Sequence, residues 1–314
     1  MASIKGVVYK LLHDRSQFCD SIVRNFLGFL PDKLYLSLIY RCRMGHWINW
    51  KNPKTFTEKL QWLKVYDYKP EYTKMVDKLA VKDYVASRIG EEYIIPTLGV
   101  WDKVEDIDWD SLPDQFVLKT THGGGGCGVV VCSDKTHFDK TKAIKKLQIS
   151  MHSNAGKTYR EKPYLNVPRK IIAEKFIVDD NVRETCGTSD LRDYKFFCFN
   201  GRVKCFKIDF GRFVEHHANY YSPEGKLLPF GEKGLEPDPN HVEIMPVNLN
   251  NMITIAEKLS GGFKFLRVDL YNVKGKIYFG ELTFYPASGM GAFVPEEWDE
   301  KLGRMLNLDN HHVH

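Results

Sequence analysis

FVLKTTHGGGGCG is the sequence of residues 116–128. A short apolar segment that contains one lysine, Lys119, is followed closely by four consecutive glycines. Glycine lets another group approach the backbone amides closely, and lysine adds a mobile positive charge, so the stretch is suited to holding a phosphate. The apolar segment GVVVCS follows at once, which predicts a hairpin with the glycines at its tip. Alone, the stretch also fits a flexible tip with a solvated lysine. The consecutive glycines are Gly123, Gly124, Gly125 and Gly126.

The overall composition is that of a soluble globular protein. With 314 residues the chain can form one large or two modest domains, and 43% apolar and 27% charged residues are usual for this class. The net charge of +5 is spread along the chain and does not favour a nucleic-acid-binding protein. Seven cysteines without a CxxC pair indicate reduced thiols rather than disulfides or a zinc site. No signal peptide or run of about 20 apolar residues is evident, so we expect a cytoplasmic protein without a transmembrane segment.

The N-terminal part of the sequence is predicted to be helical. Residues 1–50 carry apolar positions at helical spacing and form a predicted N-terminal helical segment. Its basic, amphipathic start suits a peripheral position on a membrane, although we favour packing on the body of the protein. Thr55 and Glu58 resemble a capping box that opens a helix over residues 55–67, and a second helix is predicted over residues 71–90.

The rest of the chain is predicted to contain mainly strands. An Asn-Gly pair at 200–201 predicts a hairpin over residues 193–210, and a turn at 274–275 predicts a last hairpin over residues 265–284. We see no internal repeat. The other predicted elements are a strand and turn at 93–104, a strand at 169–178, helices at 139–152 and 250–260, and a long loop at 222–250.

Two carboxylates are expected to meet on the last hairpin. Asp269 and Glu281 lie on opposite strands and come close to facing each other across the turn. Two carboxylates in an otherwise apolar sheet repel unless a cation lies between them, and oxygen ligands with room for phosphates indicate Mg²⁺. Arg267 points to the same face as Asp269 and could meet phosphate. The alternative is that one acid points outward and the pair never meets.

Taken in order, these motifs resemble a known superfamily. VDKLAVKDYV, FVLKTTHGGGG, IIAEKFI and RVDLY followed by GELTFYPASGMG are similar to ATP-grasp ligases arranged like D-alanine–D-alanine ligase, over about residues 75–295. More closely, NPKTFTEKLQWLKVYD with DKLAVKDYV and ELTFYPASG resembles the TupA-like ATP-grasp family of cell-surface polysaccharide (capsule) biosynthesis, from residue 52 onward.

The resemblance implies an α+β ATP-grasp fold, in which two α/β subdomains grip ATP between antiparallel sheets. Residues 1–50 would precede it as the helical segment. Residues 51–110 would form the N-terminal part of the ligase core, and residues 111–178 the lid subdomain. Residues 179–314 would form the C-terminal subdomain with the metal site.

The resemblance also implies roles for single residues. Lys78 and Lys119 would contact ATP phosphates, and together with Arg267 they would be the catalytic groups. The glycine loop would close over the phosphates. The Asn that usually follows the metal-binding Glu by two residues is Thr283 here, and its role is left open. The remaining implied roles are adenine binding by Glu174, Lys175 and Ile177, ribose binding by Asp193, Mg²⁺ binding by Asp269 and Glu281, and a position near the acceptor for Ser288, Gly289 and Met290.

The implied reaction is ATP-dependent carboxylate–amine ligation through an acyl phosphate. The substrates would be an amine, such as an amino acid, and a uronic acid of a surface polysaccharide or its precursor. Arg212, His216 and His217 are candidates for holding acidic sugar. The sequence leaves open the exact substrates, the oligomeric state, and contact with a membrane or a glycosyltransferase.

Two other functions compete with the ligase. A kinase-like phosphotransferase is suggested by LRDYKFFCFN and by Asp209-Phe210-Gly211, but the spacing from Asp193 to Asn200 is two residues too long and the glycines follow the lysine instead of preceding it. A catalytically inactive polysaccharide-binding scaffold would leave the two carboxylates and the two lysines without a purpose. We therefore expect a ligase.

Overall fold

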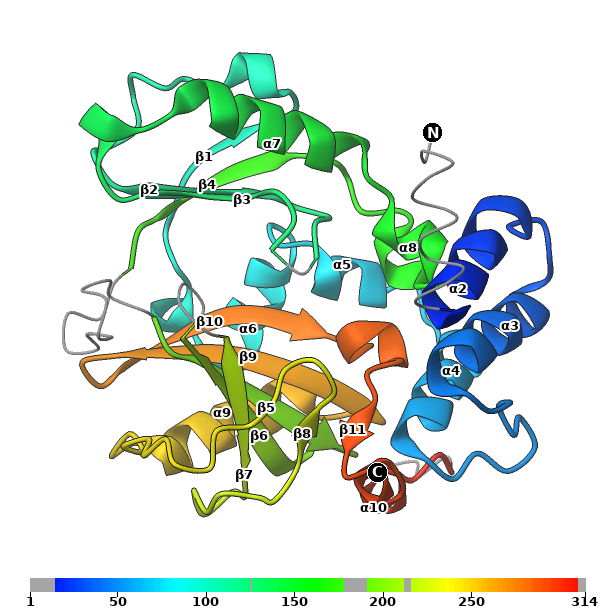
Figure 1. Cartoon of the computed structure of the whole chain (residues 1–314). Helices are drawn as coiled ribbons and strands as arrows, with labels where there is room; N and C mark the ends of the chain where they lie inside the picture. The colour runs from blue at the N-terminus through cyan, green and yellow to red at the C-terminus, as the bar shows by residue number, and fades with distance from the viewer. Residues whose placement is uncertain (1–14, 125, 178–190, 212–215, 310–314) are drawn as a thin grey trace.

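The computed structural model describes residues 15–124, 126–177, 191–211 and 216–309. Within these residues, helices and antiparallel sheets alternate along the chain, as expected for the α+β class. A four-stranded sheet with its helix forms the upper part in Figure 1, and a five-stranded sheet forms the lower part. The N-terminal helices stand at one side of both.

The upper sheet contains the glycine hairpin. β2 (Phe116–Thr120) and β3 (Val129–Cys132) pair antiparallel with Lys119 opposite Val129, so the predicted hairpin is confirmed. α7 (Lys140–His152) covers one face of the sheet (Figure 1), and its buried Leu147 packs against Phe116 and Leu118. The strand order is β1 (Thr97–Trp101), β4 (Ile171–Lys175), β2, β3.

The lower sheet contains both predicted hairpins. Its order is β10-β9-β5-β6-β7, and its inner residues form the largest apolar core. The turns at Asn200-Gly201 and Lys274-Gly275 have positive φ at both positions, which is the turn geometry that suits the twist of a hairpin. α9 (Leu249–Ser260) packs on this sheet. The strands are β5 (Asp193–Phe199), β6 (Arg202–Phe210), β7 (His217–Tyr221), β9 (Phe265–Val273) and β10 (Lys276–Thr283).

The helix predicted over residues 71–90 is divided in two. α5 (Tyr72–Val76) and α6 (Val81–Ile89) are separated by residues 77–80. The Asp77 carboxylate accepts hydrogen bonds from the backbone amides of Leu79 and Ala80, which starts a new helix where the apolar spacing suggests continuation. The break places Lys78 beside the upper sheet, where its backbone amide donates to the carbonyl of Thr121.

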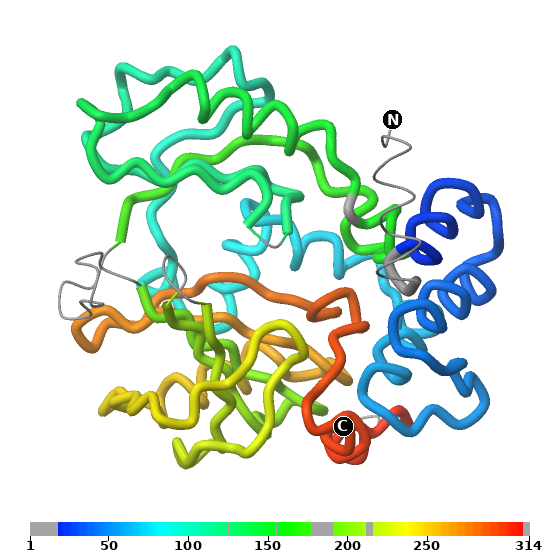
Figure 2. Tube along the Cα trace, in the orientation of Figure 1, coloured from blue at the N-terminus to red at the C-terminus, as the bar shows by residue number. Residues whose placement is uncertain are grey.

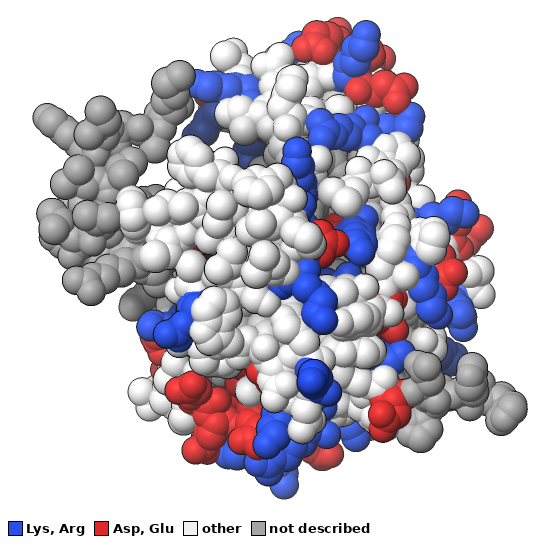
Figure 3. Space-filling model, turned by 90° about the vertical axis from the view of Figure 1, so that its right-hand side faces the viewer, with Lys and Arg blue, Asp and Glu red and all other residues white. Residues whose placement is uncertain are grey.

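The predicted helical segment at the N-terminus contains α2 (Arg15–Phe26) and α3 (Asp32–Met44); residues 1–14 lie outside the described part. Figure 3 turns this side of the molecule toward the viewer and shows uncharged side chains over a broad area, with Lys and Arg in separate places around it. Phe26, at the end of α2, and Phe29, in the loop before α3, are mainly exposed. None of the helices that the described residues form has the length and apolar character needed to cross a membrane.

α4 (Phe56–Tyr66) packs against a helix from the C-terminal part of the chain. It begins with the predicted capping box, in which Thr55 accepts from the amide of Glu58 and Glu58 accepts from that of Thr55. α10 (Glu297–Met305) packs against it, as Figure 2 shows for the red end of the trace. The shorter elements are η1 (Glu91–Tyr93), η2 (Val104–Asp106), η3 (Lys135–His137), α8 (Ala155–Thr158), η4 (Lys162–Tyr164), β8 (Gly231–Glu232), η5 (Pro286–Gly289) and β11 (Phe293–Val294).

The four-part division of the chain stays a prediction. The structure adds that β1, from the segment assigned to residues 51–110, pairs with β4 of the segment assigned to residues 111–178. The two segments therefore share one sheet.

The contact between α4 and α10 predicts a large effect of one added methyl group. A Cβ at Gly303 would lie 2.1 Å from the carbonyl oxygen of Lys54 and 2.8 Å from the amide of Phe56. Gly303→Ala should therefore destabilise the protein by about 2 kcal/mol or more, although alanine favours helices. Urea unfolding measures the difference. Gly28→Ala, at a position with nothing within 4 Å, is the control and should change little.

The burial of Lys64 predicts that the free energy of unfolding depends on pH. This lysine is buried in α4, and its Nζ donates to the carbonyls of Tyr159 and Ser288 at 3.0 and 2.7 Å. Burial lowers its pKa from 10.5 to about 8. Between these two values the unfolded chain binds the proton and the folded chain does not, so stability rises with pH.

Between pH 7.5 and 9.5 the wild type should gain about 2 kcal/mol relative to Lys64→Met, measured by urea unfolding at each pH. A stability difference that stays constant over this range would mean that Lys64 keeps its proton in the folded state.

Candidate active site

A pocket of about 650 Å³ lies between the glycine loop and the lower sheet. Charged side chains from four neighbouring strands reach its surface, and aromatic side chains form one wall. The lining residues are Gly124, Gly126, Tyr159, Glu161, Tyr164, Asp193, Lys195, Lys207, Asp209, His216, Leu235, Arg267, Glu281, Thr283, Tyr285, Ala287 and Ser288.

Asp269 on β9 and Glu281 on β10 are direct partners in the antiparallel register. A regular hairpin from the Lys274-Gly275 turn would pair Asp269 with residue 280, but a bulge at Gly280 shifts the register by one. The bulge sends Phe279 into the core and Glu281 into the pocket. The predicted convergence of the two carboxylates is confirmed, with the bulge as its local cause.

Arg267 binds both carboxylates. Its Nε lies 2.7 Å from Asp269 Oδ1, and its Nη2 lies 2.6 Å from Asp269 Oδ2 and 2.9 Å from Glu281 Oε1. Burial raises the pKa of Asp269 to about 7, with Asp193 and Glu281 adding to the rise and Arg267 opposing it. For Glu281, burial also acts upward, but the charges of Lys78 and Arg267 outweigh it and lower its pKa. The pocket floor is thus crowded with negative charge.

The carboxylate pair fits a hard divalent cation. Mg²⁺ is commonly held by one or two carboxylates, with phosphate and water as the other ligands. Among the residues that the structure describes, no group of three or more His, Cys, Asp or Glu side chains is arranged for a metal. Asp269 and Glu281 could therefore hold Mg²⁺ only together with a phosphate-bearing ligand. Thr283 donates to Glu281 Oε1 at 3.5 Å, which is a weak contact.

Glu174 on β4 forms ion pairs with two lysines, Lys82 on α6 and Lys119 on β2. Lys119 Nζ lies 2.7 Å from Glu174 Oε2, and Lys82 Nζ lies 2.6 Å from Glu174 Oε1. Burial acts to raise the pKa of Glu174, but the two lysines lower it overall. Lys82 was not predicted as a site residue. It lies one helical turn after Lys78 in DKLAVK, and this i, i+4 spacing is the signal that could have found it.

Lys78 contacts the glycine loop. Its Nζ donates to the carbonyl of Gly123. Burial lowers the pKa of Lys78, the charge of Glu281 raises it, and Lys119 lowers it further, so these three side chains lie within electrostatic reach of one another. The structure therefore brings Lys78 and Lys119, the two lysines predicted to bind phosphate, within electrostatic reach of each other and of Glu281, which lines the pocket.

The glycine loop is anchored at both ends. A Cβ at Gly123 would lie 2.5 Å from the Thr120 hydroxyl, and one at Gly128 would lie 2.2 Å from the Ser150 hydroxyl of α7. Thr120 and Ser150 hydrogen-bond to each other at 2.8 Å. Gly124 has no atom within 4 Å of a built Cβ and lines the pocket, whereas Gly125 lies outside the described residues.

The residues predicted to bind the adenosine part of ATP lie in two places. Lys175 ends β4, and its amide donates to the carbonyl of Pro96 at 3.0 Å. Ile177 follows half-buried. Asp193 begins β5 and lines the pocket, where Lys195 Nζ lies 2.8 Å from its Oδ2. The assignment of these residues to adenine and ribose stays a prediction.

Two further lysines on the pocket floor were missed from the sequence. Lys195 on β5 binds Asp209 as well as Asp193, and Lys207 on β6 binds Glu232 at 2.8 Å. Both are less than a tenth exposed. In DYK and KID the charged residues are two apart within aromatic strands, so they share one face of the sheet. That spacing was the available signal.

The fold keeps the residues of the kinase-like motif apart. Asp193 and Asp209 are register partners at one end of the β5–β6 hairpin, whereas Asn200 is in the turn at the other end. The Asn200 side chain there pairs with the backbone of Asn307 at 2.9 Å in both directions. A shared metal site of Asp and Asn, as in kinases, cannot form from these residues.

His216 and His217, two of the residues predicted to contact acidic sugar, lie in different surroundings. His216 lines the pocket, with Nε2 3.3 Å from Asp209 Oδ1. His217 instead contacts the carbonyl of Glu236 and stacks on Phe210. Arg212 lies outside the described residues.

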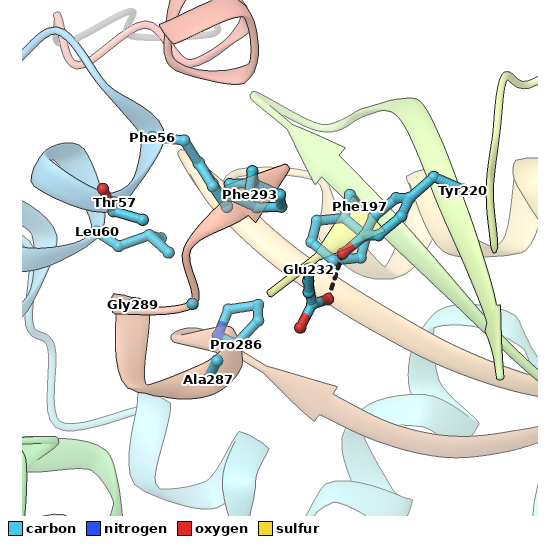
Figure 4. Close-up of a pocket in the computed structure, with 11 residues that line it drawn as sticks. Phe56, Thr57, Leu60, Phe197, Tyr220, Glu232, Pro286, Ala287, Gly289 and Phe293 are labelled. Carbon is cyan, nitrogen blue, oxygen red and sulfur yellow. Dashed lines mark hydrogen bonds between the residues drawn. The ribbon is translucent and has the colours of Figure 1, made fainter. Parts of the chain in front are cut away.

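The turn η5 forms the wall of the pocket next to α4. Ala287 and Ser288 have φ of 47° and 55°, and the carbonyls of Ser288 and Gly289 accept hydrogen bonds from Gln61 and, for Ser288, from Lys64. Figure 4 shows the other side of this turn, where a cavity of about 20 Å³ separates it from Phe197 and Tyr220. That is room for about one water molecule. Glu232 reaches this cavity and bonds to the Tyr220 hydroxyl.

The chain matches several solved structures at low sequence identity. D-alanine–D-alanine ligase from Bacillus anthracis matches with 16% identity and a TM-score of 0.38, over 67% of this chain and 57% of that one. Its ATP complex gives 17% and 0.40, over 74% and 63%. The ADP complex of purK, N5-carboxyaminoimidazole ribonucleotide synthetase, gives 16% and 0.44, over 79% and 51%. The chain thus spans between half and two thirds of the length of these structures.

No curated protein matches the sequence. The family model described as TupA-like ATPgrasp matches residues 58–307, which is about four fifths of the chain. The match includes α4 from Glu58 onward, both hairpins of the lower sheet, the glycine loop and every described residue of the pocket. The ATP-grasp fold expected from the sequence is confirmed, and the chain belongs to the TupA-like ATP-grasp family.

Proposed function

We propose that this protein is an ATP-dependent ligase that activates a carboxylate as an acyl phosphate and transfers the acyl group to an amine. The observation that carries the proposal is that Arg267, bound to Asp269, and Glu281 line one pocket with the glycine loop, while Lys78 lies within electrostatic reach of Glu281 and Lys119. This arrangement offers oxygen ligands on one side of a phosphate chain and positive charge on the other. Phosphoryl transfer is catalysed mainly by such positioning and charge neutralisation.

In the proposed reaction a carboxylate oxygen attacks the γ-phosphorus of ATP, and the bond to ADP breaks. The chain's part is to hold the reacting groups in line. Lys78 and Lys119 would neutralise the phosphates, and the amides of the glycine loop would cover them. Arg267 would steady the oxygens of the transferred group. Mg²⁺ held by Asp269 and Glu281 would supply further neutralisation of the phosphate charge.

In the second step an amine nitrogen attacks the acyl carbon, and inorganic phosphate leaves with the electron pair of the C–O bond. No residue of the chain needs to form a covalent bond. Cys127 in the glycine loop is exposed, and none of the contacts that the structure gives it is with a basic side chain. We therefore assign it no part in the reaction.

We further propose a uronic acid of a cell-surface polysaccharide, or of its precursor, as the carboxylate, and an amino acid or similar amine as the acceptor. Support comes from the family resemblance and from His216, which reaches the pocket beside Asp209 and Lys207. We expect the reaction to occur in the cytoplasm. Contact with the inner face of the membrane or with a glycosyltransferase stays a prediction.

ADP release should depend on both substrates. Purified protein is incubated with MgATP, a panel of uronic acids and a panel of amino acids, and ADP, inorganic phosphate and product mass are measured. A ligase gives one inorganic phosphate per ADP and a product with an amide bond. A kinase would give ADP while the phosphate stays on the acceptor, and an inactive scaffold would give neither. Either of these results would contradict the proposal.

Asp269→Asn should lower ATP turnover about 100-fold or more, because it removes a charge from the proposed Mg²⁺ site and a partner from buried Arg267. ADP release at saturating MgATP measures it. Asp134→Asn is the matched control, since Asp134 is exposed and its carboxylate is hydrogen-bonded to the neighbouring Thr136 and His137. Turnover within threefold of wild type in Asp269→Asn would remove Asp269 from the metal site.

A further inference from the structure

Glu161 is a pocket carboxylate that the ATP site leaves without a role. It lies just before η4, is 9% exposed and lines the pocket. The Ser288 side chain, which lines the same pocket, lowers the pKa of Glu161, although burial raises it overall. Within the described residues it forms no ion pair, although Lys64 is close enough to influence it electrostatically. A buried carboxylate with such incomplete compensation has capacity for a further cation.

Glu161 lies near the proposed reaction centre. Tyr164, three residues later, is half-buried and lines the same pocket, and its pKa is raised by burial and by the charges of both Glu161 and Glu281. Arg267 and Asp269 act on the same hydroxyl. Tyr164 is therefore within electrostatic reach of Glu161 and of the Arg267, Asp269 and Glu281 group. A ligand beside Glu161 would therefore share the pocket with Arg267 and Glu281.

The wall around Glu161 suits an ammonium group. Tyr159, Tyr164 and Tyr285 line the pocket with it, and aromatic faces attract cations. The same wall already accommodates one ammonium: Lys64 Nζ lies 5.6 Å from the centre of the Tyr285 ring. Lys64 does not line the pocket, because it is turned toward the carbonyls of Tyr159 and Ser288. Lys64 thus holds the backbone of Tyr159 and Ser288 from outside the pocket. The side of Glu161 that lines the pocket remains accessible to a ligand.

We propose that Glu161 binds the ammonium group of the amine substrate and takes a proton from it. The inference rests on the proposed ligase function and names the side of the pocket from which the amine attacks. It also assigns the acceptor class, a primary amine that is protonated in solution. No earlier step of the reaction requires Glu161.

The proton and electron balance of the step is complete. The carboxylate of Glu161 takes one proton from R–NH₃⁺ and leaves R–NH₂. The nitrogen lone pair forms the C–N bond, and the C–O bond to phosphate breaks with its electron pair on phosphate. The second proton of the nitrogen goes to the departing phosphate, which leaves as HPO₄²⁻. Glu161 then returns its proton to solvent.

The groups that face Glu161 agree with this role. Burial raises its pKa, while Lys64 on α4 and the Ser288 hydroxyl on η5 lower it. Tyr164 and Tyr285 are the other titratable groups that sense its charge, and burial raises both of their pKa values. They stay neutral at the pH of the reaction, so Glu161 is the base on this wall.

The test compares two nucleophiles in Glu161→Gln. Hydroxylamine is mostly uncharged at neutral pH and traps an acyl phosphate without a base, whereas an amino acid must lose a proton first. With the uronic acid of highest turnover in the screen above, Glu161→Gln should lower kcat for the amino acid about 100-fold. Hydroxamate formation should stay within threefold of wild type. Glu297→Gln, at an exposed position of α10, is the matched control and should alter neither rate.

Two further measurements separate catalysis from folding. Glu161→Asp should recover part of the amino-acid rate. Raising the pH should restore the Glu161→Gln rate about tenfold per unit, because free amine accumulates in solution. Equal loss with both nucleophiles, or no pH rescue, would overturn the role of Glu161 while leaving the ligase in place. Absence of carboxylate-dependent hydroxamate in the wild type would overturn the ligase proposal and this inference with it.

Discussion

The ion pair of Arg267 with Asp269, extended to Glu281, constrains the rest of the structure. An ion moved from water to a protein interior costs several kcal/mol unless it is paired. Here the planar guanidinium offers two parallel bonds to one carboxylate and a third to its neighbour. A slip of β10 by one residue would send Glu281 toward the apolar core. The bulge at Gly280 is therefore a requirement of the charge arrangement.

The pocket above this ion pair is built from segments far apart in the sequence. The glycine loop comes from the upper sheet, and the tyrosine wall comes from residues 159–164 and η5. α4 joins these parts, since Lys64 binds two carbonyls that are more than 100 residues apart in the chain. The helix thus acts as a shared support for both sides of the aromatic wall.

Local signals were sufficient to predict much of the fold. The Asn-Gly and Lys-Gly turns fixed two hairpins, and the Thr55 capping box fixed the start of α4. The break between α5 and α6 escaped prediction, because apolar spacing continues across it and only the Asp77 side chain ends it.

The site was predicted in part. The facing of Asp269 and Glu281 followed from counting along a hairpin, although the count alone was one residue off. Lys195 and Lys207 were missed although the spacing in DYK and KID places each on one face of its strand with an aspartate. Their pairings with Asp209 and Glu232, and the position of Glu161, arise from packing between segments distant in the sequence, which no local pattern encodes.

The pairing of Glu174 with Lys82 and Lys119 has a consequence for the energetics of nucleotide exchange. Under the proposed function, a phosphate that binds Lys119 takes the place of a carboxylate already bound to it. Binding is then a substitution of one anion for another, and only the difference between the two contributes to affinity. A departing nucleotide leaves no bare cation behind, because Glu174 stands ready to replace it. The site is thereby biased toward rapid release, which suits an enzyme that must discharge ADP in every turnover.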